Sequence, residues 1–191
     1  MRTTILIISM LLTTAIFGQS YEVRVHDNPN EYAPNEPSIC INRANIEQLT
    51  GGANIYNHYF SNDAGKSWTR NQLRSSYGVW GDPVLHSDID GHIYFLHLAR
   101  TKGKNRNYGF IDRIVIQTST DGGKTFNNGA YAGFNGDKVQ DKPWISTDDY
   151  SSERKGNAYI TWTEFDQYGS KSKDHHSRIQ FSKSTDKGTT W

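Results

Sequence analysis

Three acidic side chains stand just before a proline at corresponding points of the sequence. They occur in Glu36-Pro37, Asp82-Pro83 and Asp141-Lys142-Pro143, and each proline opens a short apolar run. If these points come together near one axis, Glu36, Asp82 and Asp141 could form an acidic ring that binds a cation, a basic ligand or a sugar. The alternative is structural, because a carboxylate at a strand start can accept backbone hydrogen bonds. We favour the structural role and keep the acidic ring as a candidate site.

Other reactive side chains lack the spacing of a catalytic or metal site. The histidines are scattered, His175-His176 lie in a polar loop, and no two-histidine zinc motif occurs, so the sequence predicts neither a metal nor a cofactor. Gly65-Lys66-Ser67 is similar to the end of a phosphate-binding loop, but Phe60 replaces the earlier glycine. Some aromatic residues predicted in loops could stack on sugars, although such residues more often pack the edges of sheets: Tyr77, Trp80, Tyr108 and Tyr131.

An octapeptide with the pattern S-x-D-x-G-x-[ST]-[WF] occurs three times. Its Asp can accept hydrogen bonds from the N–H groups of a tight turn, and its Gly supplies a backbone conformation that is costly for other residues. The closing aromatic side chain buries a large apolar face. We therefore predict a structural role, at hairpin turns, for the residues that define the pattern: Ser61, Asp63, Gly65, Trp68, Ser119, Asp121, Gly123, Phe126, Ser184, Asp186, Gly188 and Trp191.

Strand-like segments surround each octapeptide in a repeating order. The predicted strands include residues 38–41, 56–60, 84–86, 92–98, 113–118, 144–146, 158–165 and 178–183. Four short antiparallel strands per repeat are typical of a β-propeller blade, whereas a β-sandwich would not explain the same turn three times. We predict an all-β propeller of four-stranded antiparallel blades, with about three blades present. The composition agrees, because aromatic residues make up 13% and there are 17 glycines.

The N-terminus predicts secretion. Arg2 gives a positive region, Ile5 to Phe17 is apolar but short for a bilayer, and Gly18 and Ser20 offer small residues for cleavage. We predict a signal peptide over residues 1–20 and a propeller domain over residues 21–191; an uncleaved membrane anchor is the alternative. No other segment could cross a membrane.

The net charge of +1, without long runs of one sign, gives no nucleic-acid footprint. The single cysteine, Cys40, is expected to be a buried apolar residue.

The octapeptide resembles the Asp box, or BNR repeat, of the sialidase (neuraminidase)-like superfamily, and the resemblance covers residues 36–191. It implies a β-propeller that acts on or binds glycans. In that family three arginines bind the substrate carboxylate, a Tyr assisted by a Glu is the nucleophile, and an Asp is the acid/base. Arg100, in Ala99-Arg100, matches the second arginine and is the candidate substrate clamp. Gly81 stands where the first arginine would be, and residues 101–111 contain no acid, because Asp112 is predicted to start the next strand.

Two functions therefore remain open. The first is a secreted sialidase-like propeller for glycan recognition or, in the full-length protein, exo-glycosidase hydrolysis of the sialidase type. The alternative is a non-catalytic propeller scaffold that binds glycans or proteins. A propeller closes with about four to eight blades, so we predict that this chain is the N-terminal part of a longer propeller, half of six blades, and inactive alone. A self-contained three-bladed protein is the alternative. The sequence assigns no other catalytic residue and no oligomeric state.

Overall fold

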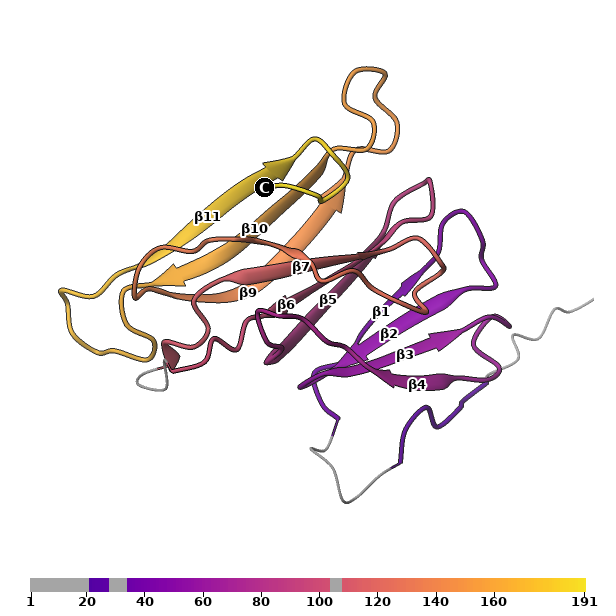
Figure 1. Cartoon of the computed structure of the whole chain (residues 1–191), viewed down its shortest axis with the longest axis horizontal. Coiled ribbons are helices and arrows are strands. Elements are labelled where there is room, and N and C mark those ends of the chain that lie inside the picture. Colours follow the sequence, from indigo (N-terminus) through magenta and orange to yellow (C-terminus); the bar gives the residue numbers. More distant parts are fainter. Residues whose placement is uncertain (1–20, 28–33, 104–107) are drawn as a thin grey trace, which may run out of the picture.

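The structure, a computed structural model, describes residues 21–27, 34–103 and 108–191. Within these residues the chain forms strands and no α-helix, so no described segment is a helix that could cross a membrane. The predicted signal peptide, residues 1–20, lies outside the described residues. The strands group in chain order into three antiparallel sheets, which confirms the all-β fold built of propeller blades (Figure 1).

Each sheet is a blade in which every strand pairs with the next one along the chain. The first blade contains β1 (Ser38–Ile41), β2 (Leu49–Ala53), β3 (Asn57–Ser61) and β4 (Thr69–Gln72). The second contains β5 (Gly81–Ser87), β6 (Ile93–Leu98), β7 (Ile114–Ser119) and β8 (Ala130–Ala132). The third contains β9 (Val139–Thr147), β10 (Ala158–Phe165) and β11 (Ser177–Ser184).

Most predicted strands match the observed ones to within one or two residues, but β5 and β9 begin before their prolines. The sequence placed these strands after Pro83 and Pro143, because proline donates no ladder hydrogen bond. The structure instead continues each strand through the proline and shifts the pairing register there, between Gly81 and Val84 and opposite Thr161–Thr163. A local irregularity of this kind bends a strand and re-aims its side chains.

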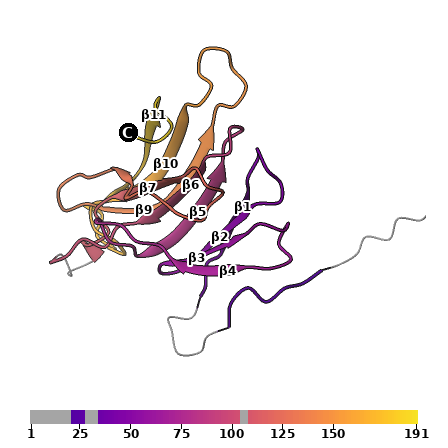
Figure 2. The ribbon, with the colours of Figure 1, turned by 45° about the vertical axis from the view of Figure 1, so that its right-hand side comes forward.

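The first strands of the three blades lie side by side, with β5 between β1 and β9 (Figure 2). The Leu85 N–H donates to the Ser38 hydroxyl at 3.0 Å and links the first two blades. Nε2 of His86 in the second blade lies 2.8 Å from the Thr147 hydroxyl of the third blade and links these two blades. The arrangement brings the starts of β1, β5 and β9 to one region of the molecule.

Two hydrophobic clusters fill the spaces between blades. Between the first and second blades the cluster includes Leu85, Ile93 and Phe95, with Cys40 against it. Burial raises the pKa of the Cys40 thiol to about 12, in agreement with the apolar role predicted for it. Between the second and third blades a larger cluster joins β6 and β7 to β9 and β10, with these members at its centre: Tyr94, Leu96, Ile114, Ile116, Ile145, Ile160 and Trp162. Every residue of β6 is buried, because neighbouring blades cover both faces of the middle sheet.

The three octapeptides form the same turn. In each, the Ser hydroxyl donates to the Asp carboxylate at 2.7 Å and accepts the Gly N–H at 2.8–3.0 Å. The Asp also accepts the N–H of the seventh residue at 2.9 Å and its hydroxyl at 2.6 Å. Hydrogen bonds from the Ser67 hydroxyl first, and from the Ser67 N–H, lower the pKa of Asp63 to about 2. Each turn thus satisfies its own polar groups.

The second and third octapeptide turns also contact the preceding blade. The carbonyl of Gly123, in the second blade, lies 2.6 Å from Nε2 of His58 in the first. A Cβ atom at Gly123 would overlap the Thr50 hydroxyl, and one at Gly188 would press on the Tyr94 ring of the second blade. Glycine is therefore required at these two positions for a second reason that the sequence did not show: two blades approach each other closely there.

Candidate functional site

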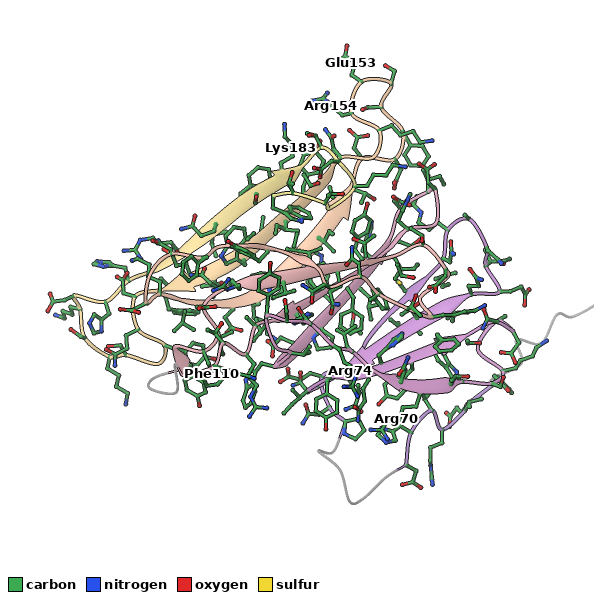
Figure 3. All side chains as sticks on the ribbon, in the orientation of Figure 1. Arg70, Arg74, Phe110, Glu153, Arg154 and Lys183 are labelled. Atoms are coloured by element: carbon green, nitrogen blue, oxygen red, sulfur yellow. The ribbon has the colours of Figure 1, made fainter. Side chains whose placement is uncertain are left out.

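The two ends of the blades carry different loops. The octapeptide turns lie at one end, with the β9–β10 loop that carries Glu153 and Arg154 (Figure 3). The strand starts of β1, β5 and β9 lie at the other end, as do the β2–β3, β6–β7 and β10–β11 loops, and Figure 3 labels Phe110 there. We call this second end the mouth and define its polar cluster by Glu36, Asn54, Asp82, Lys142 and Tyr168.

The residue before each first-strand proline has the same unusual backbone. Glu36, Asp82 and Lys142 have φ angles of 50°, 50° and 51°. Side chains other than glycine rarely adopt this left-handed region, and residues held there often belong to functional sites. The structure therefore places Lys142, not Asp141, at the position equivalent to Glu36 and Asp82. The ring was predicted from the sequence to be wholly acidic, but its third position is a lysine.

Contacts between blades connect the members of this ring. Nζ of Lys142 lies 3.2 Å from Oδ2 of Asp82. This hydrogen-bonded carboxylate raises the pKa of Lys142, so the amine stays protonated. Asn54, in the β2–β3 turn, donates to Oε2 of Glu36 at 2.9 Å and accepts the Asp82 N–H at 2.6 Å.

Asn54 also explains why no arginine stands at position 81. A Cβ atom at Gly81 would overlap Oδ1 of Asn54, and the φ angle of Gly81 is 123°. Both features exclude a long side chain. The amide of Asn54 thus occupies the space next to Gly81, the position where the family resemblance would place the first clamp arginine.

Asp141 lies beside the ring and near Tyr168 of the β10–β11 loop. The charge of Asp141 raises the pKa of Tyr168, which shows that the carboxylate and the phenol lie near each other. Asp141 also accepts the Lys142 N–H at 2.8 Å. The carboxylates of Glu36, Asp82 and Asp141 therefore all lie at the mouth, and each has a partner.

Aromatic rings extend from Tyr168 across the second blade. The Tyr168 and Tyr108 ring centroids are 5.1 Å apart, Tyr108 and Phe110 are 6.0 Å apart, and Phe110 and Trp80 are 4.8 Å apart. Tyr108 is 49% exposed and Tyr168 is 39% exposed, so both rings can meet a ligand. Tyr108 and Trp80 were among the predicted sugar-stacking residues. The other two, Tyr77 and Tyr131, pack against each other and around Arg113.

Arg100 and Asp112 lie apart from the polar cluster. The Arg100 guanidinium is placed over the Trp80 ring at 4.9 Å, at the far end of the aromatic series. Asp112 is completely buried, pairs with Arg113 at 2.8 Å and accepts the Thr101 hydroxyl at 2.8 Å. Its carboxylate is therefore buried in the β6–β7 loop and held by these two partners.

Several site residues were missed from the sequence. Asn54 and Tyr168 had no motif, and Lys142 was passed over for the neighbouring acid. Lys142 directly precedes Pro143, just as Glu36 precedes Pro37 and Asp82 precedes Pro83. This adjacency was the signal that could have identified it. Asn54 and Tyr168 could be found only from contacts between different blades and loops.

Comparison with solved structures places the fold among β-propellers of glycoside hydrolases. A GH93 alpha-L-arabinofuranosidase of Fusarium graminearum with arabinobiose has a TM-score of 0.55 at 14% identity, over 83% of this chain and 48% of that enzyme. A mutant alpha-L-arabinofuranosidase from the same organism with an iminosugar inhibitor has a TM-score of 0.51 at 14% identity, over 76% of this chain and 44% of that one. No protein-family model and no curated protein sequence matches the chain. The chain thus spans about half the length of the enzymes whose fold it shares.

Proposed function

We propose that the mouth is a carbohydrate-binding site and that this chain is the N-terminal part of a secreted glycoside hydrolase of the sialidase-like type. One observation carries the proposal: the starts of β1, β5 and β9 bring Glu36, Asp82 and Asp141 together with Lys142 beside the exposed ring of Tyr108. Carboxylates accept hydrogen bonds from sugar hydroxyls, and aromatic rings offer a flat apolar face. The likeness to arabinofuranosidase structures supports this fold as a carrier of such sites.

Hydrolysis requires an acid and a second group that acts as base or nucleophile on the other side of the glycosidic bond. Asp82 is the central candidate, because its side chain is 19% exposed and it contacts both neighbouring blades. Its N–H donates to Asn54 of the first blade, and its carboxylate pairs with Lys142 of the third. Glu36 and Asp141 flank it. Because Gly81 leaves no room for a clamp arginine, recognition of a substrate carboxylate at this position would differ from that of sialidases.

The test is turnover by the full-length protein, expressed from residue 21, on a panel of aryl glycosides that includes α-L-arabinofuranosides and sialosides. Asp82→Asn is expected to lower kcat/KM by about a hundredfold or more, since acid/base groups contribute on that scale. Glu153→Gln removes an exposed acid at the other end and serves as the matched control. Equal activity of the two variants would refute a catalytic role for Asp82.

A second candidate function is binding without catalysis. The observation that favours it is that each mouth carboxylate already has a partner: Glu36 has Asn54, Asp82 has Lys142, and Asp141 has the Lys142 N–H. Saccharide binding measured by calorimetry, without release of sugar from any glycoside, would support this scaffold role.

A further inference from the structure

A buried hydrogen-bond network lies next to the mouth in the third blade. Its centre is Gln140, the second residue of β9, which is completely buried. Oε1 of Gln140 accepts the indole N–H of Trp162 at 2.6 Å, and its Nε2 donates to Oε2 of Glu164 at 3.3 Å. Its backbone N–H donates at 2.8 Å to the Ile111 carbonyl in the β6–β7 loop of the second blade. We call Gln140, Trp162 and Glu164 the β9 anchor.

Neighbouring residues hold the β9 anchor from its other side. The Glu164 carboxylate is buried and also accepts the side-chain N–H groups of Asn135 at 3.0 Å and of Gln180 at 3.4 Å. A Cβ atom at Gly133 would lie 2.9 Å from Nε1 of Trp162, so glycine allows the chain before β9 to approach the indole. Buried polar groups with partners favour one arrangement of the strands that carry them, whereas apolar side chains can repack. A polar anchor at this place therefore serves geometry more than stability.

The β9 anchor spans the irregularity in the pairing of β9 with β10. The register skips Trp162, which stands opposite two residues of β9, Lys142 and Pro143. Gln140 precedes these residues in β9, and its hydrogen bond to Trp162 reaches across the irregular stretch. Lys142 has its φ angle of 51° inside this stretch. A residue in that region keeps its backbone only where the surroundings over-determine it, and the β9 anchor supplies such surroundings.

The second blade has the same irregularity but a different buried residue opposite it. His97 stands opposite Asp82 and Pro83, where the pairing of β5 with β6 shifts. Its Nδ1 lies 2.9 Å from the Leu98 carbonyl and its Nε2 lies 3.1 Å from Oε1 of Gln117 in β7. Both ring nitrogens are thus engaged on β6 and β7, and neither is engaged on β5. In the third blade the equivalent side chain, that of Trp162, is instead tied to the strand that enters the mouth.

We propose that Gln140 is a positioning residue for the mouth. Through Trp162 and Glu164 it fixes the backbone of the next two residues, Asp141 and Lys142, so that the lysine amine reaches Asp82 in the second blade. The mouth is then set for a ligand before the ligand arrives. The inference rests on the proposed function in naming a glycan as that ligand, but the placement of Lys142 can be measured without a glycan.

Titration of the Lys142 amine in the full-length protein, followed by NMR with isotope-labelled lysines, is the first test. The hydrogen-bonded carboxylate of Asp82 raises the pKa of Lys142 above its ordinary value of 10.5. Gln140→Met keeps the length of the side chain and removes its amide, and we expect the pKa of Lys142 to return toward the ordinary value. An unchanged pKa of Lys142 in Gln140→Met would overturn the proposal.

Gln180→Met is the matched control. It makes the same substitution on β11 and removes a hydrogen bond to the same carboxylate of Glu164, but it leaves β9 untouched. The pKa of Lys142 should stay raised in this variant, and an equal change in both variants would mean a general loosening of the blade. Trp162→Phe keeps a ring and removes the indole donor; if Gln140→Met does not fold, Trp162→Phe should show a smaller change in the same direction, and no change there would also overturn the proposal.

A double variant tests whether Gln140 acts on ligand binding through Lys142. Calorimetry with arabino-oligosaccharides and sialyllactose as probes compares the affinities of the full-length protein and its variants. We expect Gln140→Met and Lys142→Met each to lower affinity about fivefold to tenfold, and the double variant to lose about tenfold, because both changes remove the same contact. Losses that multiply, to about fiftyfold or more, would show independent effects and would overturn the proposal.

The two kinds of failure can be told apart. If neither probe binds the wild type while the pKa of Lys142 falls in Gln140→Met, the proposed glycan function fails and the positioning role stands. If a probe binds and Gln140→Met changes neither the affinity nor the pKa of Lys142, only the positioning role fails.

Discussion

Nζ of Lys142 lies 3.2 Å from Oδ2 of Asp82 and joins the third blade to the second at the mouth. The lysine side chain is 71% exposed. Exposed ion pairs add little to stability, because water and salt screen them and two long side chains lose freedom. A role in orienting Asp82 toward a ligand therefore accounts for the pair better than a role in holding the blades together.

Lys142→Met is expected to separate these two roles. The unfolding free energy should change by less than about 1 kcal/mol, whereas glycan affinity or kcat/KM should fall about tenfold because Asp82 loses its cationic partner. Urea denaturation and calorimetry of the full-length protein measure the two effects. Lys66→Met, at an octapeptide turn, is the control. A stability loss above about 2 kcal/mol with unchanged glycan binding would show that the pair is structural.

Asp121→Ala tests the octapeptide turn. Removing the carboxylate leaves the N–H groups of Lys124 and Thr125 and two hydroxyls without their acceptor. We expect a loss of about 1–3 kcal/mol in unfolding free energy, measured by urea denaturation. Lys124→Ala changes the same turn without removing an acceptor and should be close to neutral. A midpoint for Asp121→Ala that matches the wild type would contradict a structural role for this acid.

Much of the fold follows from the sequence because its determinants are local. The hydrogen bonds among the Ser, Asp, Gly and hydroxyl-bearing seventh residue of an octapeptide turn form within eight residues, so the copies of the pattern place the β3–β4 and β7–β8 hairpins and the end of β11. The strand 158–165 was predicted with its observed bounds from local signals too, because it is an aromatic segment that directly follows the Gly156-Asn157 turn.

The mouth could be predicted only in part, because its geometry depends on contacts between blades. Proline suggested that β5 and β9 begin later than they do, and the shifted register is what gives Lys142 the place equivalent to Asp82. The sequence showed that Gly81 is not an arginine, but the reason is Asn54, a residue of another blade. Asp112 was expected at a strand start, and only the fold shows that it is buried beside Arg113.

Gly123→Ala tests the contact between blades at the octapeptide end. The new methyl group would overlap the Thr50 hydroxyl, and the residue would keep a φ angle of 80°. Gly169→Ala, with a φ angle of 68° and open space around its Cβ position, measures the backbone cost alone. We expect Gly123→Ala to destabilise by about 1–3 kcal/mol more than Gly169→Ala, and Thr50→Ala to relieve part of the difference. Equal losses in the two glycine variants would mean that the blades separate readily here.

His97 predicts a pH dependence of stability. It is fully buried between Leu98 and Gln117, and burial lowers its pKa to about 4, below its ordinary value of 6.5. The unfolded chain therefore binds the proton more readily than the folded one, so His97 favours folding above pH 6.5 and its contribution is lost as the pH falls toward 4. The slope from one such group is about 1 kcal/mol per pH unit.

Denaturant unfolding between pH 7 and pH 4.5 measures this slope. In His97→Gln the slope should be smaller by about that amount, while His58 and His86, whose pKa values burial also lowers, keep part of it. An unchanged slope in His97→Gln would contradict the assignment of the acid sensitivity to this buried histidine.

The central claim is that glycans bind at the mouth, and a crystal structure of the full-length protein soaked with an oligosaccharide that it binds in solution tests it most directly. The predicted result is a saccharide within hydrogen-bond distance of Asp82 or Lys142, with a sugar ring against Tyr108 or Tyr168. A saccharide bound at the octapeptide end, with the mouth unoccupied, would contradict the claim.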